Sequence, residues 1–146
     1  MSSVSLYLNF QGQTEAAFGF YARVFGTAPV AMTRFEDLPP DPSAPPMPEA
    51  IAKQILNVQL PILGGFMLMG SDVPEGRQTT MGNNCLINLS PDTRMQTRQL
   101  FSALSAGGVV NMPLEEMFWG GYFGSLTDQF GIHWMFNCHA KESEQQ

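Results

Sequence analysis

The sequence MPLEEMFWGGYFGSLTDQFGIHWMFNC, residues 112–138, decides the fold of this chain. It contains both tryptophans and the Glu-Glu pair of the chain. Residues 121–127 and 132–138 each read as a strand with two different faces. Between them, Asp128 to Gly131 carry a turn signal. We therefore predict a β-hairpin in this part of the chain.

The composition of the 146-residue chain is that of a globular protein, with 44% hydrophobic and 11% aromatic residues. This length suits one domain or two similar halves that share a core. A formal charge of −6 and only seven Lys and Arg residues argue against nucleic acid, which requires clustered basic side chains. No apolar run approaches the roughly 18 residues of a membrane span, and no signal pattern begins the chain. We expect a cytoplasmic protein without a membrane partner.

The two cysteines, Cys85 and Cys138, each lie in an apolar, strand-like run. Neither belongs to the CxxC spacing of redox and zinc motifs. We expect both to be reduced, buried thiols, and a disulfide or a metal-binding pair is the alternative.

The first half of the chain is predicted to form a strand, a helix and three further strands. The strands are expected at residues 6–10, 29–35, 55–60 and 66–69. The helix is expected to begin at a Thr14 cap and to end at Gly26. Residues 36–49 contain six prolines and are expected to form a long loop, because proline disrupts both helices and sheets.

The second half repeats this order. Its strands are expected at residues 84–89, 109–112, 121–127 and 132–138. Residues 90–92 (SPD) should initiate the helix. Its apolar stripe consists of Met95, Leu100, Phe101 and Leu104. The fold class is therefore α+β, with two βαβββ modules at residues 4–72 and 83–138 of a single domain, 1–146, and a polar tail at 139–146.

One face of each predicted strand is apolar, and the other mixes amides, methionines, a phenol and an imidazole. In the third strand, this alternation places Ile55 and Asn57 on the mixed face. Such a face is typical of a ligand cavity, and a solvated sheet face is the alternative. The candidate ligand-binding residues are Tyr7, Asn9, Asn57, Met69, Trp119, Phe123, His133, Met135 and Asn137.

Several motifs resemble one protein family. They are residues 7–10 (YLNF), 20–26 (FYARVFG), 70–76 (GSDVPEG), 112–119 (MPLEEMFW) and 124–137 (GSLTDQFGIHWMFN). Together with the repeated order, they resemble the PhnB-like branch of the vicinal oxygen chelate superfamily, often labelled demethylubiquinone methyltransferase-like. That superfamily includes glyoxalase I, bleomycin-resistance proteins and extradiol dioxygenases. The resemblance implies two βαβββ modules whose sheets curve around a cavity, commonly in a homodimer.

Enzymes of this superfamily hold a divalent metal on His and Glu side chains of their strands, and the metal acts as a Lewis acid. The resemblance places the corresponding positions at Ser5, Leu86, Met135 and either Leu68 or Met69. None of these is a usual ligand for a hard or borderline ion, and Ile55 occupies a position where relatives in this branch often have histidine. We therefore expect no metal and no cofactor, with a divalent metal (Zn, Ni, Mn or Mg) as the alternative.

Glu116 is the candidate catalytic residue, because a carboxylate near the Trp119 indole could serve as a general acid or base. A solvent-facing loop carboxylate is the alternative. His133 could bind a ligand or move a proton, although a hydrogen-bonded structural role is also open. Arg34 could meet an anionic ligand or pair with Glu36 or Asp37.

Two functions remain open from the sequence. The first is metal-free binding of a small molecule in a sheet-lined cavity, as in the antibiotic-binding members of the superfamily. The second is an enzyme of glyoxalase or dioxygenase type, acting as a lyase, isomerase or oxygenase. It would use a metal at displaced ligands or Glu116 as a general base.

Overall fold

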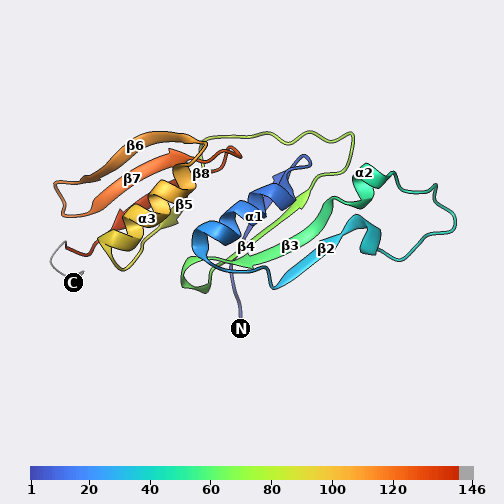
Figure 1. The fold of residues 1–146 in the computed structure, drawn as a ribbon, viewed down its shortest axis with the longest axis horizontal. Helices are drawn as coiled ribbons and strands as arrows, with labels where there is room; N and C mark the ends of the chain where they lie inside the picture. The colour runs from blue at the N-terminus through green and yellow to red at the C-terminus, as the bar shows by residue number, and fades with distance from the viewer. Residues whose placement is uncertain (142–146) are drawn as a thin grey trace. The chain divides into compact units, whose positions relative to one another are not determined.

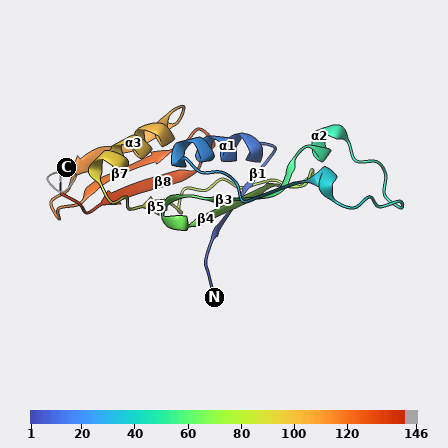
Figure 2. The same cartoon turned by 60° about the horizontal axis from the view of Figure 1, so that its bottom comes forward.

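The computed structural model describes residues 1–141 and divides the chain into two compact units, Met1–Thr80 and Met81–Gln146. Each unit contains a four-stranded sheet with a helix on one face (Figures 1 and 2). The end of the expected polar tail, residues 142–146, lies outside the described part. No helix in residues 1–141 has the length and apolar character needed to span a membrane.

The first unit contains the predicted strand, helix and three strands. These are β1 (Leu6–Phe10), α1 (Thr14–Phe25), β2 (Ala31–Arg34), β3 (Ile55–Pro61) and β4 (Met67–Asp72). Short helical segments occur at η1 (Phe35–Asp37), α2 (Glu49–Ala52) and η2 (Leu63–Gly65). The sheet order is β1-β4-β3-β2, with β1 and β4 parallel and the other pairs antiparallel.

The second unit repeats this topology. Its elements are β5 (Ile87–Leu89), α3 (Arg94–Ser105), β6 (Val109–Glu116), β7 (Tyr122–Thr127) and β8 (His133–Cys138). The sheet order is β5-β8-β7-β6, again with one parallel pair at β5 and β8. The α+β class and the two βαβββ modules are therefore confirmed, and neither sheet closes on itself.

The start of α1 differs from the prediction, because the cap comes from a distant aspartate. Thr14 is the first helical residue, and Gln13 at the N-cap position makes no side-chain capping bond. Asp72 supplies the acceptor instead: its Oδ1 accepts from the Gly12 and Thr14 amides at 2.9 and 3.1 Å and from the Thr14 hydroxyl at 2.8 Å. Its Oδ2 accepts from the Ile55 amide at 2.9 Å. Asp72 thus joins the end of β4 to the starts of α1 and β3.

The second helix begins later than predicted. Thr93 is its N-cap and accepts a hydrogen bond from the Gln96 amide, so residues 90–92 lie outside the helix. In this phase Met95 is 55% exposed and does not belong to the buried stripe. Leu100, Phe101 and Leu104 are buried as predicted.

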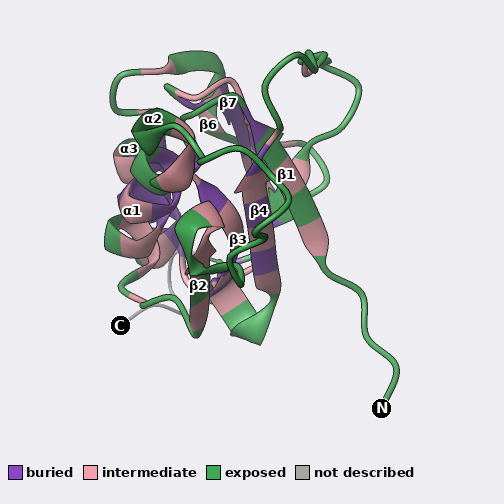
Figure 3. Ribbon diagram, turned by 90° about the vertical axis from the view of Figure 1, so that its right-hand side faces the viewer, coloured by how far each residue is buried: buried purple, intermediate pink, exposed green. Residues whose placement is uncertain are grey.

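Each unit has its own core between helix and sheet. Fully buried side chains of the first unit include Phe18, Tyr21, Val58, Leu60 and Leu68. Those of the second include Leu104, Leu126, Trp134 and Phe136. Figure 3 shows buried residues on β4 and exposed residues along the N-terminal segment. A Cβ at Gly70 would lie 2.7 Å from Phe18, so this glycine lets the helix approach the sheet closely.

Two predictions about burial are wrong. Ile55 is fully buried, because the pairing of β2 with β3 shifts register between Thr33 and Arg34 and so interrupts the alternation. Cys85 is exposed, because β5 begins only at Ile87. Cys138 is buried in β8 as expected, and both thiols are free.

Candidate functional site

Each sheet has one face that is covered by a helix and one that is not; the uncovered face is called here the open face of that sheet. The open face of the second sheet is the one turned away from α3. Strand alternation and register place on it three cross-strand pairs of β7 and β8: Phe123 with Asn137, Ser125 with Met135, and Thr127 with His133. Between them along β8, Trp134 and Phe136 point into the core and are fully buried. The face therefore brings together four predicted ligand-binding residues of the second unit: Phe123, His133, Met135 and Asn137.

The loop between β6 and β7 adds an aromatic group to this face. Trp119 is 53% exposed, and its ring lies 6.4 Å from that of Phe123 in an edge-to-face arrangement. Phe118 is almost fully exposed and packs edge-to-face on Trp119 at 5.0 Å. These large apolar surfaces are accessible to a planar molecule, which aromatic rings bind by stacking.

Asn137 lies beneath this aromatic group. A Cβ built on Gly121 would be 2.5 Å from Trp119 Nε1 and 2.8 Å from Asn137 Oδ1, so both side chains crowd the same glycine. The Asn137 Oδ1 atom is buried and has no hydrogen-bond partner among the described residues. A buried acceptor without a donor is costly. A donor from another molecule would relieve this cost once the exposed Trp119 indole, which crowds the same glycine, moves aside.

His133 is held at both ring nitrogens. Nε2 lies 2.9 Å from the Gly82 carbonyl, which can only accept, so Nε2 carries a proton. Nδ1 lies 2.9 Å from the Thr127 hydroxyl, and that hydroxyl accepts from the Asn111 amide at 2.9 Å. In the neutral ring, the Thr127 hydroxyl donates to Nδ1. The arrangement supports the structural alternative for His133 and leaves no ring nitrogen free to bind a metal.

Glu116 does not join the open face. It is paired in register with Tyr122 and forms a 2.9 Å ion pair with Arg94 of α3, so it lies on the helix side of the sheet. The Arg94 side chain is 6% exposed, stacks over Tyr122 and also donates to the Ala140 carbonyl. The neighbouring Glu115 is paired with Phe123 and is the carboxylate on the open face.

The sequence did not single out Glu115, Ser125 or Thr127. β6 shifts register twice, between Val110 and Met112 and between Met112 and Glu115. Because such irregularities break strict alternation, the faces of Glu115 and Glu116 cannot be read from the sequence. Ser125 and Thr127 lie in a run in which Gly124 and Leu126 face the core, a period-two signal that could have identified both.

The open face of the first sheet is richer in amides. It contains the predicted Tyr7, Asn9, Asn57 and Met69, together with Gln59 and Ser71, which the prediction omitted. Long hydrogen bonds join them: Asn57 to Tyr7 at 3.5 Å, Gln59 to Asn57 at 3.4 Å and Ser71 to Asn9 at 3.4 Å. Such weak contacts leave these polar groups able to exchange partners with a ligand.

Arg34 has a different partner from those expected. Its guanidinium forms an ion pair with Glu15 of α1 and donates to the Lys53 carbonyl at 2.6 Å. The Asp37 carboxylate accepts from the backbone amide of Arg34, and Glu36 pairs with Lys53. The hydrogen bond from Arg34 holds the pKa of Glu15 below its ordinary value.

The residues present do not fit the divalent metal of the superfamily enzymes. Within residues 1–141, no three His, Cys, Asp or Glu side chains come together to hold an ion. At the expected ligand positions, the Ser5 hydroxyl donates to the thioether of Met69 at 3.4 Å, and Met135 faces Ser125. Hard divalent ions prefer oxygen ligands, borderline ions such as zinc and nickel also take imidazole, and a thioether suits softer ions.

Comparison with known proteins relates the chain to proteins that match it over their full length. Protein YjdN of Escherichia coli K12 is 27% identical over 97% of this chain and 99% of its own. Protein PA1353 from Pseudomonas aeruginosa has a solved structure that is 33% identical, with a TM-score of 0.82, and covers 97% of this chain and 100% of that one. No protein-family model matches the chain.

Two more distant structures have the same fold. The PhnB protein from Bacillus cereus is 22% identical, with a TM-score of 0.70, over 94% of this chain and 99% of that one. A glyoxylase/bleomycin resistance protein/dioxygenase domain from Frankia sp. EAN1pec is 14% identical, with a TM-score of 0.67, over 97% and 94% of the two chains. The chain belongs to the same family as protein PA1353, and it has the fold of the PhnB protein and of the glyoxylase/bleomycin resistance protein/dioxygenase domain.

Proposed function

We propose that the protein binds a small planar organic molecule on the open face of its second sheet, without a divalent metal. The observation that carries this proposal is the buried, unpartnered Oδ1 of Asn137 beneath the Trp119 indole. A ligand donor would satisfy this acceptor while the ligand ring stacks on Trp119 or Phe123. Met135 supplies an adaptable apolar contact on the same face.

The enzyme alternative has less support from the arrangement of the residues. Glu116, its candidate general base, faces α3 and is paired with Arg94. His133, its candidate displaced metal ligand, uses both nitrogens within the unit. The remaining groups on the face bind and orient a molecule through stacking and hydrogen bonds.

Tryptophan fluorescence tests the proposal, because one of the two tryptophans is exposed and the other is fully buried. We would titrate the protein in EDTA with 2-amino-1,4-naphthoquinone, a planar molecule whose amino group can donate a hydrogen bond. We expect the Trp119 emission to be quenched saturably. In the matched variant Trp119→Phe, the remaining emission comes from Trp134 and should not respond.

The variant Asn137→Leu separates binding from folding. Because Oδ1 has no partner in the free protein, removing the amide should leave the free energy of unfolding unchanged or raise it. A ligand with a hydrogen-bond donor should nevertheless bind about tenfold more weakly. Binding that requires added zinc, or an equal response of Trp119 and Trp134, would contradict the proposal.

A further inference from the structure

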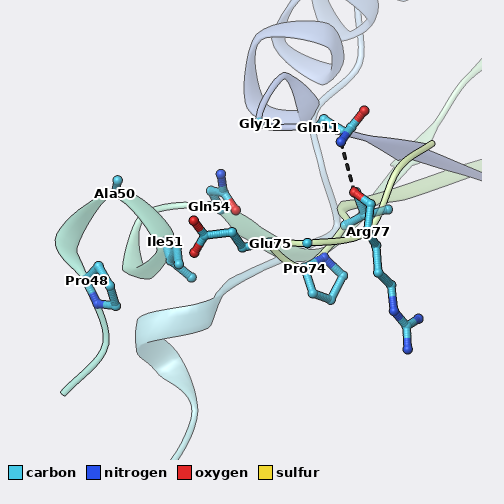
Figure 4. Close-up of a pocket in the computed structure, with 11 residues that line it drawn as sticks. Gln11, Gly12, Pro48, Ala50, Ile51, Gln54, Pro74, Glu75 and Arg77 are labelled. Atoms are coloured by element: carbon cyan, nitrogen blue, oxygen red, sulfur yellow. Dashed lines mark hydrogen bonds between the residues drawn. The ribbon is translucent and has the colours of Figure 1, made fainter. Parts of the chain in front are cut away.

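A pocket in the first unit lies at the carboxyl ends of the parallel strands β1 and β4, and all its lining residues belong to that unit. Its volume is about 420 Å³, which is within the range of small-molecule sites. Its lining residues follow β1, follow β4 or belong to the segment around α2: Gln11, Gly12, Pro48, Ala50, Ile51, Gln54, Val73, Pro74, Glu75, Gly76 and Arg77 (Figure 4). Crevices at the carboxyl ends of parallel strands are frequent ligand sites.

Gln11 fixes one wall of this pocket. Its Nε2 donates to the Arg77 carbonyl at 3.0 Å, and its Oε1 accepts from the Thr79 amide at 3.5 Å. The Val73 amide donates to the Phe10 carbonyl at 2.8 Å and anchors the same segment closer to β4. The wall is therefore formed before any ligand arrives, which lowers the entropic cost of binding.

The pocket combines an apolar wall with one aimed carboxylate. Figure 4 shows the Glu75 carboxylate directed toward Gln54 and Ile51, while the Arg77 guanidinium points away from Glu75. Within residues 1–141, neither the Glu75 nor the Gln54 side chain has a hydrogen-bond or ion-pair partner. A smaller hollow of about 220 Å³ shares Gly12, Ala50 and Gln54 and adjoins the pocket.

We propose that this pocket binds a small organic amine with an apolar body. The ammonium group would donate to the Glu75 carboxylate and to the Gln54 carbonyl oxygen, since both are acceptors on the same side. The apolar body would pack against Ile51, Val73 and Pro74. The net charge of −6 favours the approach of a cation over an anion. This site is separate from the one under Proposed function and does not depend on it.

Two probes of matched shape and opposite charge test the proposal: 2-phenylethylamine and 3-phenylpropionate. Binding is followed by chemical shifts of the Gly12 and Gly76 backbone amides and of the Gln54 side-chain amide. We expect the amine to shift these signals saturably and the carboxylate to shift them much less. The variant Glu75→Gln should weaken amine binding about fivefold. The control Asp92→Asn should leave amine binding unchanged, because it removes an exposed carboxylate of the second unit, which does not line the pocket.

Glu75 is exposed, so Glu75→Gln should fold, and its circular dichroism spectrum confirms this before titration. Equal or tighter binding of 3-phenylpropionate would overturn the charge assignment. Amine shifts that Glu75→Gln does not weaken, or that appear on Met135 and Asn137 instead, would overturn the site. An absence of shifts at saturating amine would also overturn it.

Discussion

Removing the carboxylate of Asp72 should lower the free energy of unfolding more than a substitution at a nearby surface residue. Asp72 is 3% exposed and accepts four hydrogen bonds, two of them from the amides of the fully buried Thr14 and Ile55. In Asp72→Ala, these two amides lose their acceptor in a place that water does not reach. At about 1–3 kcal/mol for each buried unsatisfied group, the expected loss in the free energy of unfolding is about 4 kcal/mol.

The variant Asp72→Asn tests the same reasoning at finer scale. One amide oxygen can accept from the start of α1 or from Ile55, but not from both, so the loss should be about half that of Asp72→Ala. Urea denaturation followed by circular dichroism measures each value. The exposed Asp41, whose carboxylate accepts from the amide and hydroxyl of the nearby Ser43, is the matched control, and Asp41→Ala should cost less than about 1 kcal/mol. Losses of equal size at Asp72 and Asp41 would refute the proposed role of Asp72.

Three further predictions concern other contacts. Arg34 lowers the pKa of Glu15, so the ion pair contributes its full stabilisation above the ordinary pKa of 4.5 and loses it as the pH falls through the lower pKa of the folded state. The difference in free energy of unfolding between the protein and Glu15→Gln should therefore shrink only below about pH 4.5. Gly121→Ala should displace Trp119, which shifts the emission maximum and lowers the free energy of unfolding by about 1–2 kcal/mol. The control Gly19→Ala should stabilise α1, because the nearest atom to its new Cβ is 3.6 Å away. Glu116→Gln should lower the free energy of unfolding, measured in urea, by about 1 kcal/mol, because it removes the carboxylate paired with buried Arg94. A loss no larger than that of Glu115→Gln would contradict this role of the ion pair.

The hairpin of β7 and β8 was predictable because its signals are local. Alternation along residues 132–138 places Trp134 and Phe136 in the core, and Asp128 holds the turn through the Phe130 and Ile132 amides. The repeated order of elements was predictable for the same reason. The hydrophobic periodicity of each strand and helix is visible within a short window of sequence.

The errors arise where distant or irregular features decide the structure. The cap of α1 comes from Asp72, 58 residues away from Thr14, which no local pattern reveals. The strand β6 extends to Glu116 through two register shifts, which place Glu116 on the helix side beside Arg94, and the register shift beside β3 buries Ile55. The homodimer and the cytoplasmic location remain predictions, because the fold of one chain determines neither.

The hydrogen bonds of Gln11 have a consequence for protease resistance. Residues 73–86 connect the two sheets and contain one basic residue, Arg77, which is the target that trypsin requires. The carbonyl at this peptide bond accepts from Gln11, whose Oε1 also holds the Thr79 amide, so the bond cannot adopt the free extended form that a protease cleft needs without breaking both contacts. Glycines and polar residues give this connector the composition of an easily cut linker. The hydrogen bond from Gln11 to the Arg77 carbonyl should slow trypsin at this site, because it must open before the bond can be cut.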